Sequence, residues 1–342
     1  GVLIVLSRMN RILEVDVANR TATVEAGCVN LDIDRAAMPH GLFFAPDPAS
    51  QQASTIGGNV AENAGGPHCL KYGATINHVL GARVVLPDGE IASFGGRLAD
   101  RPGYDLVGVF VGSEGTLGIC TEVTVRLLPR PQAVKTILAV FRTIEDASNA
   151  VSAIIARGIV PVALEMIDQE TTRAVEAYAK AGYPLDAGAV LLIELEGLRA
   201  EIAVEAVEVE AACRAHACLD LKVARTEAER TLLWKGRKSA AGAFGRMTGT
   251  TITRTPLFPA PSWRLCSARL PGSARSTACA CPTFFTPATG ISTRSCATTR
   301  VCPGSSSGPW RPAMRSCAAV SARAGRSAAS TASGSRSGAI CA

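Results

Sequence analysis

Two glycine-rich stretches hold the residues whose types and spacing could do chemistry. The first, "PDPASQQASTIGGNVAENAGGPHCLKYG", spans residues 46–73, and the second, "VGSEGTLGI", spans residues 111–119. Paired glycines let backbone N–H groups approach a phosphate closely, and small polar side chains add directed hydrogen bonds. Neither stretch is a Walker loop or a dinucleotide GxGxxG motif that opens a helix. The residues alone predict an anion-binding domain, and a purely structural role for the second stretch stays open.

The elements that must position these stretches are mainly strands. "ILEVDVANRTATVEAG" predicts two strands around an Asn-Arg turn, and "NLDIDRAAMPHGL" predicts a short helix that ends near Gly41. "GARVVLPDGEIASFG" predicts a hairpin that turns at Pro87-Asp88-Gly89. "ICTEVTVRLLP" predicts a strand ending at Pro129. We expect these elements to form one domain over residues 1–130.

From residue 131 the pattern alternates between strand and helix. "VKTILAVF", "ALEMID" and "AVLLIELEG" predict strands, and "TIEDASNAVSAIIARG" and "QETTRAVEAYAKAG" predict the helices between them. A long amphipathic helix, "AEIAVEAVEVEAACRAHA", and a final helix, "RTEAERTLLWKGRKSAAGAFGRM", follow. The fold class is therefore α+β, with an open sheet covered by helices as a second domain over residues 131–247.

The charge of the chain is divided unevenly. Residues 248–342 contain 11 Arg and no Lys, Asp or Glu, which leaves 24 basic and 29 acidic side chains in residues 1–247. The basic isoelectric point therefore comes from the tail. A basic arm that binds nucleic acid or membrane is the alternative, but such arms usually contain Lys and seldom contain Cys. We expect no nucleic-acid partner, and an irregular tail.

Cysteines and apolar runs indicate a cytoplasmic protein. Seven of the 12 cysteines lie in the tail without CxxC spacing or a neighbouring His, so neither a zinc site nor a disulfide framework is predicted. The other five are Cys28, Cys69, Cys120, Cys213 and Cys218, and apolar surroundings favour reduced core residues. No apolar run reaches the roughly 18 residues of a membrane helix. "GVLIVL" is too short for a signal peptide core and is expected to be a buried strand with missing upstream neighbours.

The two glycine-rich stretches, together with "GYDLVGVFVGSEGTLGICTEVTVRLLP", resemble the FAD-binding domain of vanillyl-alcohol oxidase type, also called PCMH-type. The most similar group contains the glycolate oxidase subunit GlcD and the FAD-linked D-2-hydroxy-acid dehydrogenases, and the resemblance covers about residues 1–247. It implies that the first stretch lines the FAD diphosphate and isoalloxazine and that the second contacts the adenosine side. The positions that this resemblance assigns to FAD are Pro46, Asp47, Thr55, Gly57, Gly58, Asn59, Gly65, Gly66, Glu114, Gly115, Gly118 and Ile119. Backbone amides are expected to bind FAD more than charges do.

The resemblance also implies a substrate site. Arg237 in "LWKGRKSA" matches the family arginine that binds the substrate carboxylate, and a guanidinium suits a 2-hydroxy acid because it binds bidentately and stays charged. The alternative is an exposed Arg on a basic helix surface beside Lys235 and Lys238. His68 lies inside the flavin stretch, but this group does not normally attach FAD covalently through His, so no such bond is expected.

The implied reaction is oxidation of glycolate, D-lactate or a similar 2-hydroxy acid to the 2-oxo acid. In the family, a His removes the hydroxyl proton, a divalent metal helps to anchor the substrate, and hydride passes to the flavin. The implied partners are the small 2-hydroxy acid and other glycolate oxidase subunits. A peripheral position on the inner face of the membrane is an alternative to a free cytoplasmic one.

Several family motifs are absent. A "PRGxGTGLSGG"-like loop would precede Gly1, so the chain is expected to lack the N-terminal part of its FAD domain. "YYxxDxVVPRSKL", "HAGDGNLHP" and "GEHGxGxxK", which contain the family's metal ligands and catalytic His, are missing after "LWKGRKSA". The catalytic residues are therefore unknown, and no metal ligand is assigned.

The missing motifs reappear in another reading frame. Displaced by one nucleotide and read with GC-rich codons, residues 284–295 give "LHAGDGNLHPL", residues 328–337 give "GEHGVGIEK", and residues 249–263 give "YYxxDAVVPRSKL". Three motifs in the family's order predict a frameshift close to Met247 and an inactive chain. Two further hypotheses are a non-catalytic flavin-binding or complex subunit, and a relative of alkyl-dihydroxyacetone-phosphate synthase.

Overall fold

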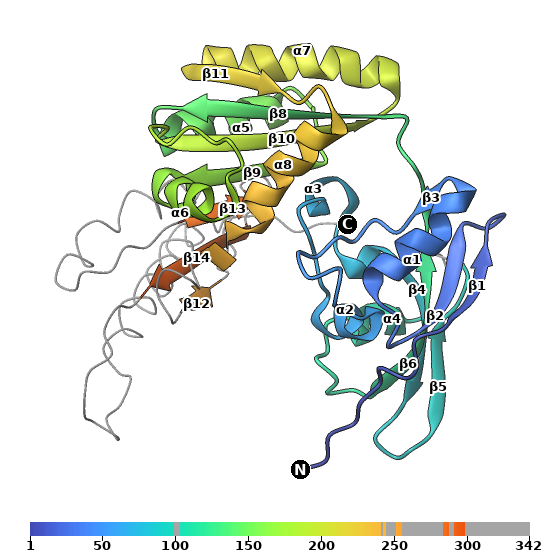
Figure 1. The fold of residues 1–342 in the computed structure, drawn as a ribbon. Coiled ribbons are helices and arrows are strands. Elements are labelled where there is room, and N and C mark those ends of the chain that lie inside the picture. Colours follow the sequence, from blue (N-terminus) through green and yellow to red (C-terminus); the bar gives the residue numbers. More distant parts are fainter. Residues whose placement is uncertain (99–102, 241, 244–250, 255–282, 287–290, 298–342) are drawn as a thin grey trace, which may run out of the picture. The chain divides into compact units, whose positions relative to one another are not determined.

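The computed structural model describes residues 1–98, 103–240, 242–243, 251–254, 283–286 and 291–297 (Figure 1). Within these residues the strands form a five-stranded sheet, a seven-stranded sheet and one two-stranded pair. The strands and helices up to residue 129 are β1 (Ile12–Asp16), β2 (Thr21–Glu25), α1 (Asn30–Ala37), β3 (Leu42–Phe43), α2 (Ile56–Glu62), α3 (Cys69–Tyr72), β4 (Val79–Val85), β5 (Ile91–Gly95), α4 (Leu106–Phe110), β6 (Ile119–Arg126) and β7 (Leu128–Pro129).

The first sheet is antiparallel throughout and has the order β1-β2-β6-β4-β5. Its two hairpins turn where the sequence predicts, because Arg20 has φ 54° between β1 and β2 and Gly89 has φ 88° between β4 and β5. Both residues adopt the left-handed conformation that tight turns need. The short helix α1 also ends as predicted, before Gly41 at φ 68°.

The glycine-rich stretches lie on the helix side of this sheet. Ile56 and Val60 of α2 and Phe110 of α4 are buried against strand residues such as Val84 and Val123. These apolar contacts place α2 and the residues after α4 together, although about 50 residues separate them in the sequence. Packing of this core therefore brings the two predicted anion-binding stretches to one place.

The second sheet begins at β8 and contains the order β11-β8-β10-β9, again antiparallel. The prediction of strands alternating with helices under an α+β architecture is confirmed, and β11 is an additional strand that the sequence reading missed. Its residues, "CLDLKV", alternate apolar Leu219, Leu221 and Val223 with polar Asp220 and Lys222, which is the pattern of an edge strand with one buried face, so the sequence did contain a signal for it. The elements are β8 (Ala133–Phe141), α5 (Ile144–Ala156), β9 (Ala163–Asp168), α6 (Gln169–Ala179), β10 (Ala189–Gly197), α7 (Arg199–Ala215), β11 (Cys218–Val223) and α8 (Glu227–Lys238).

Helices α5, α6 and α8 begin at side-chain caps, whereas α7 does not. Thr143, Asp168 and Thr226 accept hydrogen bonds from backbone N–H groups three residues later, at the first turns of α5, α6 and α8. Such caps satisfy donors that no helical carbonyl can reach. They fix the starting points of the helices, and for α8 this sets where Arg237 lies along the helix.

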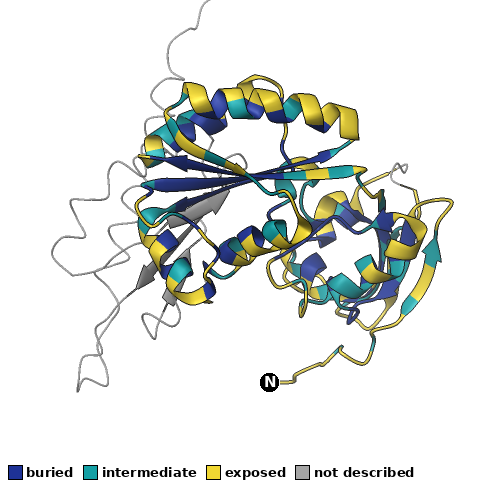
Figure 2. Ribbon diagram, turned by 45° about the horizontal axis from the view of Figure 1, so that its top comes forward, coloured by how far each residue is buried: buried dark blue, intermediate teal, exposed yellow. Residues whose placement is uncertain are grey.

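Strand β10 divides its side chains between two helical layers. Leu191 and Ile193 pack into the core beneath α5 and α7, whereas Val190 and Leu192 pack into the core beneath α6 and α8. Figure 2 shows the central strands buried and the outer faces of the helices exposed. Because successive strand residues point to opposite faces, Glu194 shares the α6/α8 face with Leu192.

Three short strands occur in the arginine-rich tail, at β12 (Thr251–Arg254), β13 (Thr283–Thr286) and β14 (Ile291–Ala297). They extend the sheet from β9 in the order β9-β13-β14-β12, with two residue pairs joining β13 to β9. This differs from the irregular tail that the composition predicts. Without β13, strand β9 would be an edge of this sheet, and Thr, Phe and Ile are residues that pair readily with such an edge.

The cysteines of residues 1–240 are free thiols, as the sequence predicts. Cys28, Cys120 and Cys213 are buried. Burial raises the pKa of Cys28 to about 11 and that of Cys120 to about 12. These thiols therefore stay protonated and unreactive near neutral pH.

Replacing Leu192 by Ala should destabilise the chain strongly. Leu192 is fully buried beneath α6 and α8, and a Leu→Ala cavity in a core costs about 2–5 kcal/mol of unfolding free energy. Leu198→Ala is the control, because Leu198 is 57% exposed and its loss should cost less than about 0.5 kcal/mol. Urea unfolding followed by circular dichroism measures both values. Equal costs for the two variants would contradict this assignment of the core.

Candidate functional site

A cavity of about 290 Å³ lies between the two glycine-rich stretches. Five of the twelve FAD positions predicted from the resemblance line it: Gly57, Gly58, Gly115, Gly118 and Ile119. The other lining residues are mostly apolar, namely Ile4, Leu6, Val60, Ala61, Phe110, Ser113 and Cys120. Its size is near the lower end for ligand pockets, so it suits one part of a dinucleotide better than the whole.

The glycine pair at the start of α2 serves close packing. The Gly57 amide donates to Ala26 O at 2.8 Å, and the Gly58 amide donates to the Thr55 hydroxyl at 3.3 Å. A Cβ at Gly57 would lie 2.8 Å from the Ala26 Cβ. These amides are therefore engaged within the protein, which differs from the expectation that they bind a diphosphate directly.

A buried polar atom in the cavity wall makes the site suitable for a polar ligand. Ser113 Oγ, which lines the cavity, has no hydrogen-bond partner among the described residues, and the same holds for Asn59 Nδ2 on α2. Buried polar groups in native proteins are almost always paired, so such atoms indicate a missing ligand or water. An apolar cavity with a few polar atoms at its wall fits the mixed ring and hydroxyl chemistry of FAD.

The second glycine pair packs against the start of its own loop. A Cβ at Gly66 would lie 2.3 Å from Asp47 O, so only glycine permits this approach. The Pro46 carbonyl accepts a hydrogen bond from Asn30, and Asp47 Oδ1 accepts one from the His68 amide at 3.2 Å. These contacts close residues 46–73 into one loop, which we call the flavin loop.

The remaining predicted FAD positions shape the backbone around the cavity. Thr55 caps α2, and Glu114 has φ 53° while its amide donates to Ala61 O at 2.9 Å. Seven of the predicted positions lie outside the cavity lining: Pro46, Asp47, Thr55, Asn59, Gly65, Gly66 and Glu114. Their role in FAD binding stays a prediction.

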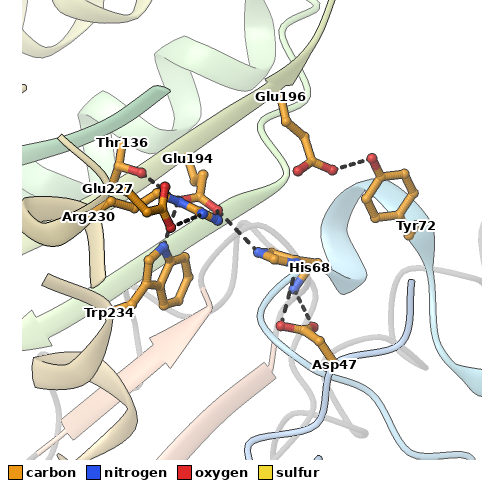
Figure 3. Close-up of polar contacts among 9 residues, drawn as sticks. All are labelled: Asp47, His68, Tyr72, Thr136, Glu194, Glu196, Glu227, Arg230 and Trp234. Carbon is orange, nitrogen blue, oxygen red and sulfur yellow. Dashed lines mark hydrogen bonds and ion pairs between the residues drawn. The ribbon is translucent and has the colours of Figure 1, made fainter. Parts of the chain in front are cut away.

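A buried charged cluster joins the flavin loop to β10 and α8 (Figure 3). It consists of Asp47, His68, Thr136, Glu194, Arg230 and Trp234, and we call it the Glu194 cluster. Glu194 has a fully buried side chain, and its carboxylate accepts from Thr136 Oγ1 at 2.5 Å and from Trp234 Nε1 at 2.6 Å. Arg230 donates through Nε at 3.0 Å and Nη2 at 2.9 Å, one bond to each oxygen.

His68 lies between two carboxylates. Its Nδ1 is 3.4 Å from Asp47 Oδ2, and its Nε2 is 3.4 Å from Glu194 Oε1. The ring also contacts Trp234 edge to face, with ring centres 5.8 Å apart. A neighbouring contact is made by Glu196, whose carboxylate accepts from the Tyr72 hydroxyl and whose carbonyl accepts from Lys71 Nζ at 2.5 Å.

The pKa values follow from these contacts. Burial lowers the pKa of His68, but Asp47 and Glu194 raise it more, so the net shift is upward. Burial raises the pKa of Glu194, yet hydrogen bonds from His68 and Arg230 overcome this and hold it well below the ordinary value. Burial raises the pKa of Asp47 despite the nearby His68. His68 is therefore the group whose charge balances this site near neutral pH.

Arg237 lies beside this cluster on α8. Its side chain is 15% exposed, and Nη2 is 2.7 Å from the Oε2 atom of Glu165, which is fully buried on β9. Nε of Arg237 donates to the same oxygen at 2.8 Å. Lys235 and Lys238 on the same helix are exposed. Arg237 is therefore distinct from them, and the reading of it as a surface residue is not supported.

Sequence reasoning missed the acidic residues of this site. Glu165, Glu194 and Glu196 lie in "ALEMID" and "AVLLIELEG", which were read as core strands. Carboxylates within apolar strands are costly to bury unless they are paired. Their presence in these strands was the signal that could have located the site.

The described residues contain no group of three or more His, Cys, Asp or Glu that could hold a metal ion. The metal expected for the intact family therefore has no candidate ligands in this part of the chain, and no step is assigned to it. None of the helices in the same residues combines the length and apolar character that a membrane crossing requires.

Comparison with protein families agrees with this geometry. Residues 1–95 match the FAD binding domain, and residues 130–255 match the C-terminal domain of FAD linked oxidases. The chain belongs to the FAD-linked oxidases. The matched FAD-binding domain and the oxidase C-terminal domain confirm the family resemblance found in the sequence.

Curated relatives of this FAD-linked oxidase include two glycolate oxidase subunits GlcD. The Escherichia coli K12 protein is 47% identical over 248 residues, which cover 72% of this chain and 50% of the relative. The Bacillus subtilis protein is 46% identical, covering 76% and 55%, and a D-lactate dehydrogenase of Anaerostipes hadrus is 35% identical, covering 69% and 51%. The chain spans about half the length of these relatives.

Solved structures share the fold. An alkyldihydroxyacetonephosphate synthase gives a TM-score of 0.70 at 21% identity, covering 86% of this chain and 61% of that chain. A p-cresol methylhydroxylase with bound substrate gives 0.68 at 15% identity, covering 87% and 66%. At these identities the likeness establishes the architecture and not the activity.

The stability of this FAD-linked oxidase should decrease as pH rises through the pKa of His68. A raised folded pKa means that the stabilisation is complete below the unfolded value of about 6.5 and is lost above the folded one. His68→Gln should flatten this alkaline loss in urea unfolding between about pH 6 and pH 9.

His78→Gln is the control for this experiment. Burial lowers the pKa of His78, so its contribution is lost as pH falls and not as pH rises. The control should therefore retain the alkaline loss of the unmodified chain. An alkaline loss that persists in His68→Gln would show that another group causes it.

Proposed function

We propose that this chain derives from an FAD-dependent enzyme that oxidises a small 2-hydroxy acid, such as glycolate or D-lactate, to the 2-oxo acid. The observation that carries the proposal is the 46–47% identity with glycolate oxidase subunits over 72–76% of the chain. The matched ranges contain Arg237 and the part of the cavity lining that comes from the first glycine-rich stretch. The D-lactate dehydrogenase relative supports the same substrate class.

The residues around the glycine-lined cavity would bind FAD. We assign this role to the positions named from the resemblance: Pro46, Asp47, Thr55, Gly57, Gly58, Asn59, Gly65, Gly66, Glu114, Gly115, Gly118 and Ile119. Five of them line the cavity, and the wall also contains Ser113, whose buried hydroxyl has no partner among the described residues. When bound, FAD supplies the two-electron acceptor that side chains lack.

Arg237 would bind the substrate carboxylate. Glu165 contacts Nε and Nη2 of its guanidinium, which fixes the plane of the group in a largely buried setting. A guanidinium can bind a second carboxylate through its other edge without losing its charge. Preorganisation of this kind lowers the entropy cost of substrate binding.

The chain as written is proposed to be inactive because its tail is out of frame. The family model ends at residue 255. This limit lies close to the frameshift placed near Met247, where the domain over residues 131–247 would give way to an out-of-frame segment. The family's catalytic His and metal ligands would then be encoded but not translated, and such losses remove several powers of ten in rate.

The partners and location are further parts of the proposal. Relatives named as subunits of glycolate oxidase support an assembly with other subunits of that complex. We place the protein in the cytoplasm, with peripheral contact to the inner face of the membrane as the alternative.

A non-catalytic flavin-binding subunit is the second candidate function. The cavity and the FAD-binding domain favour it independently of the missing catalytic residues. FAD binding without turnover after the frame is restored would support this role. A relation to alkyl-dihydroxyacetone-phosphate synthase is supported by likeness of fold, at 21% identity.

Removing Arg237 should abolish carboxylate binding. Arg237→Gln removes the cation that contacts the buried Glu165, and breaking such a buried pair can cost about 3–5 kcal/mol of stability, so Arg237→Gln/Glu165→Gln serves as the matched variant without that charge. Both should bind oxalate at least about tenfold more weakly, as followed by flavin absorbance or by calorimetry. The exposed Lys235→Gln is the control. Unchanged oxalate affinity in both Arg237 variants would refute the carboxylate role.

Restoring the frame should restore activity. Resequencing across the codons for residues 245–250 would reveal an inserted or missing base, and the corrected gene should oxidise glycolate, D-lactate or D-2-hydroxyglutarate with flavin reduction. The chain as written should be slower by at least about a thousandfold. A correct original sequence together with full activity of this chain would overturn the frameshift proposal.

A further inference from the structure

His68 connects the flavin loop to the helix that carries Arg237. From the loop, His68 immediately precedes α3 and its ring faces Asp47 of the same loop. From the second sheet, Glu194 of β10 approaches the opposite ring nitrogen at 3.4 Å. An imidazole with a carboxylate at each nitrogen can donate to both only when it carries two protons.

Glu194 also contacts α8, so it links His68 to that helix. Its carboxylate accepts from Arg230 and Trp234, which both lie on α8. Arg230, Trp234 and Arg237 have the spacing i, i+4 and i+7, so they share one face of the helix. The contacts of Glu194 therefore set the rotation and height at which α8 presents Arg237.

The charged groups around His68 come from each neighbouring element. Asp47 faces it from the loop, and Glu194 and Glu196 act on it from β10. On α8, Arg230 pairs with Glu194, and Lys238 lies 5.7 Å from the ring centre of Trp234. Asp47 and Glu194 lie closest, so removing the imidazolium charge would leave two neighbouring carboxylates with less compensation.

We propose that His68 is a positioning residue: a cationic cross-link between Asp47 and Glu194 that holds α8, and with it Arg237, against the flavin loop. Binding of FAD at the loop and binding of a carboxylate at Arg237 are then coupled through this imidazolium. The inference rests on the proposed function for the two ligands. It adds a residue and a coupling to that function.

Trp234 offers a readout that does not depend on activity. The chain contains three tryptophans, so Trp263→Phe/Trp310→Phe leaves Trp234 as the only indole. Protonated imidazole quenches an adjacent indole, and His68 contacts Trp234 edge to face. In this full-length background, Trp234 emission should increase as pH rises, with a midpoint above the ordinary histidine value of about 6.5.

The first test adds FAD to this titration. FAD is anionic and binds at the loop, so it should raise the midpoint, and by linkage the chain should bind FAD more tightly at lower pH. His68→Gln should abolish the titration, whereas His78→Gln, a change at another buried histidine, should retain it. A titration that survives His68→Gln, or a midpoint unmoved by FAD that demonstrably binds, overturns the proposal.

The second test measures oxalate binding to the FAD-loaded chain. His68→Gln should weaken oxalate binding by about tenfold and remove its pH dependence, while His78→Gln should change neither. Oxalate binding that is unchanged in His68→Gln but lost in the Arg237 variants would refute the coupling alone. Unchanged binding in the Arg237 variants would instead refute the proposed carboxylate site, and failure to bind FAD would refute the flavin-dependent function together with the coupling.

Discussion

The burial of Glu194 is the interaction on which the site depends. A carboxylate with no solvent exposure would be neutralised unless its charge were compensated locally. Here one cation, one indole and one hydroxyl donate to it, and a histidine approaches from the flavin loop. Each donor comes from a different element or turn, so satisfying one buried charge fixes β8, β10, α8 and the loop relative to that carboxylate.

This arrangement is possible because β10 pairs antiparallel with β8 and β9 and its successive side chains point to opposite faces of the sheet. Leu191, Ile193 and Leu195 fill the core beneath α5 and α7, while Val190 and Leu192 fill the core beneath α6 and α8. The same alternation brings Glu194 and Glu196 to the α6/α8 face at the end of the strand. A shift of one residue in register would exchange these faces, placing carboxylates in the apolar core. The apolar half of β10 therefore specifies the position of its acidic half.

The extent to which the site could be predicted differs between its parts. The predicted hairpins of the first 130 residues are confirmed, and Arg20 and Gly89 adopt the left-handed conformations that such turns need, but the expectation of a buried strand at "GVLIVL" is wrong, because these residues lie outside every strand and Val2 is 92% exposed. The glycine-rich stretches are recognisable in the sequence because glycine spacing is a local signal, whereas the cavity between them depends on packing. The pairing of His68 with Glu194 was not predicted, because 126 positions separate them and only the register of β10 and the capping of α8 bring them together. Long-range polar contacts carry no periodicity that a sequence reading can detect.

The tail contains segments with β-strand propensity but lacks the catalytic motifs of the family. "TFFT" and "ISTRSCA" contain β-branched and aromatic residues, and in the structure they pair beside the edge of β9. Backbone pairing needs only compatible residues and an available edge, whereas a catalytic site needs particular side chains at particular positions. Strands in this segment are compatible with the absence of the family's histidines. Pairing with a sheet edge uses backbone hydrogen bonds and does not require particular catalytic side chains.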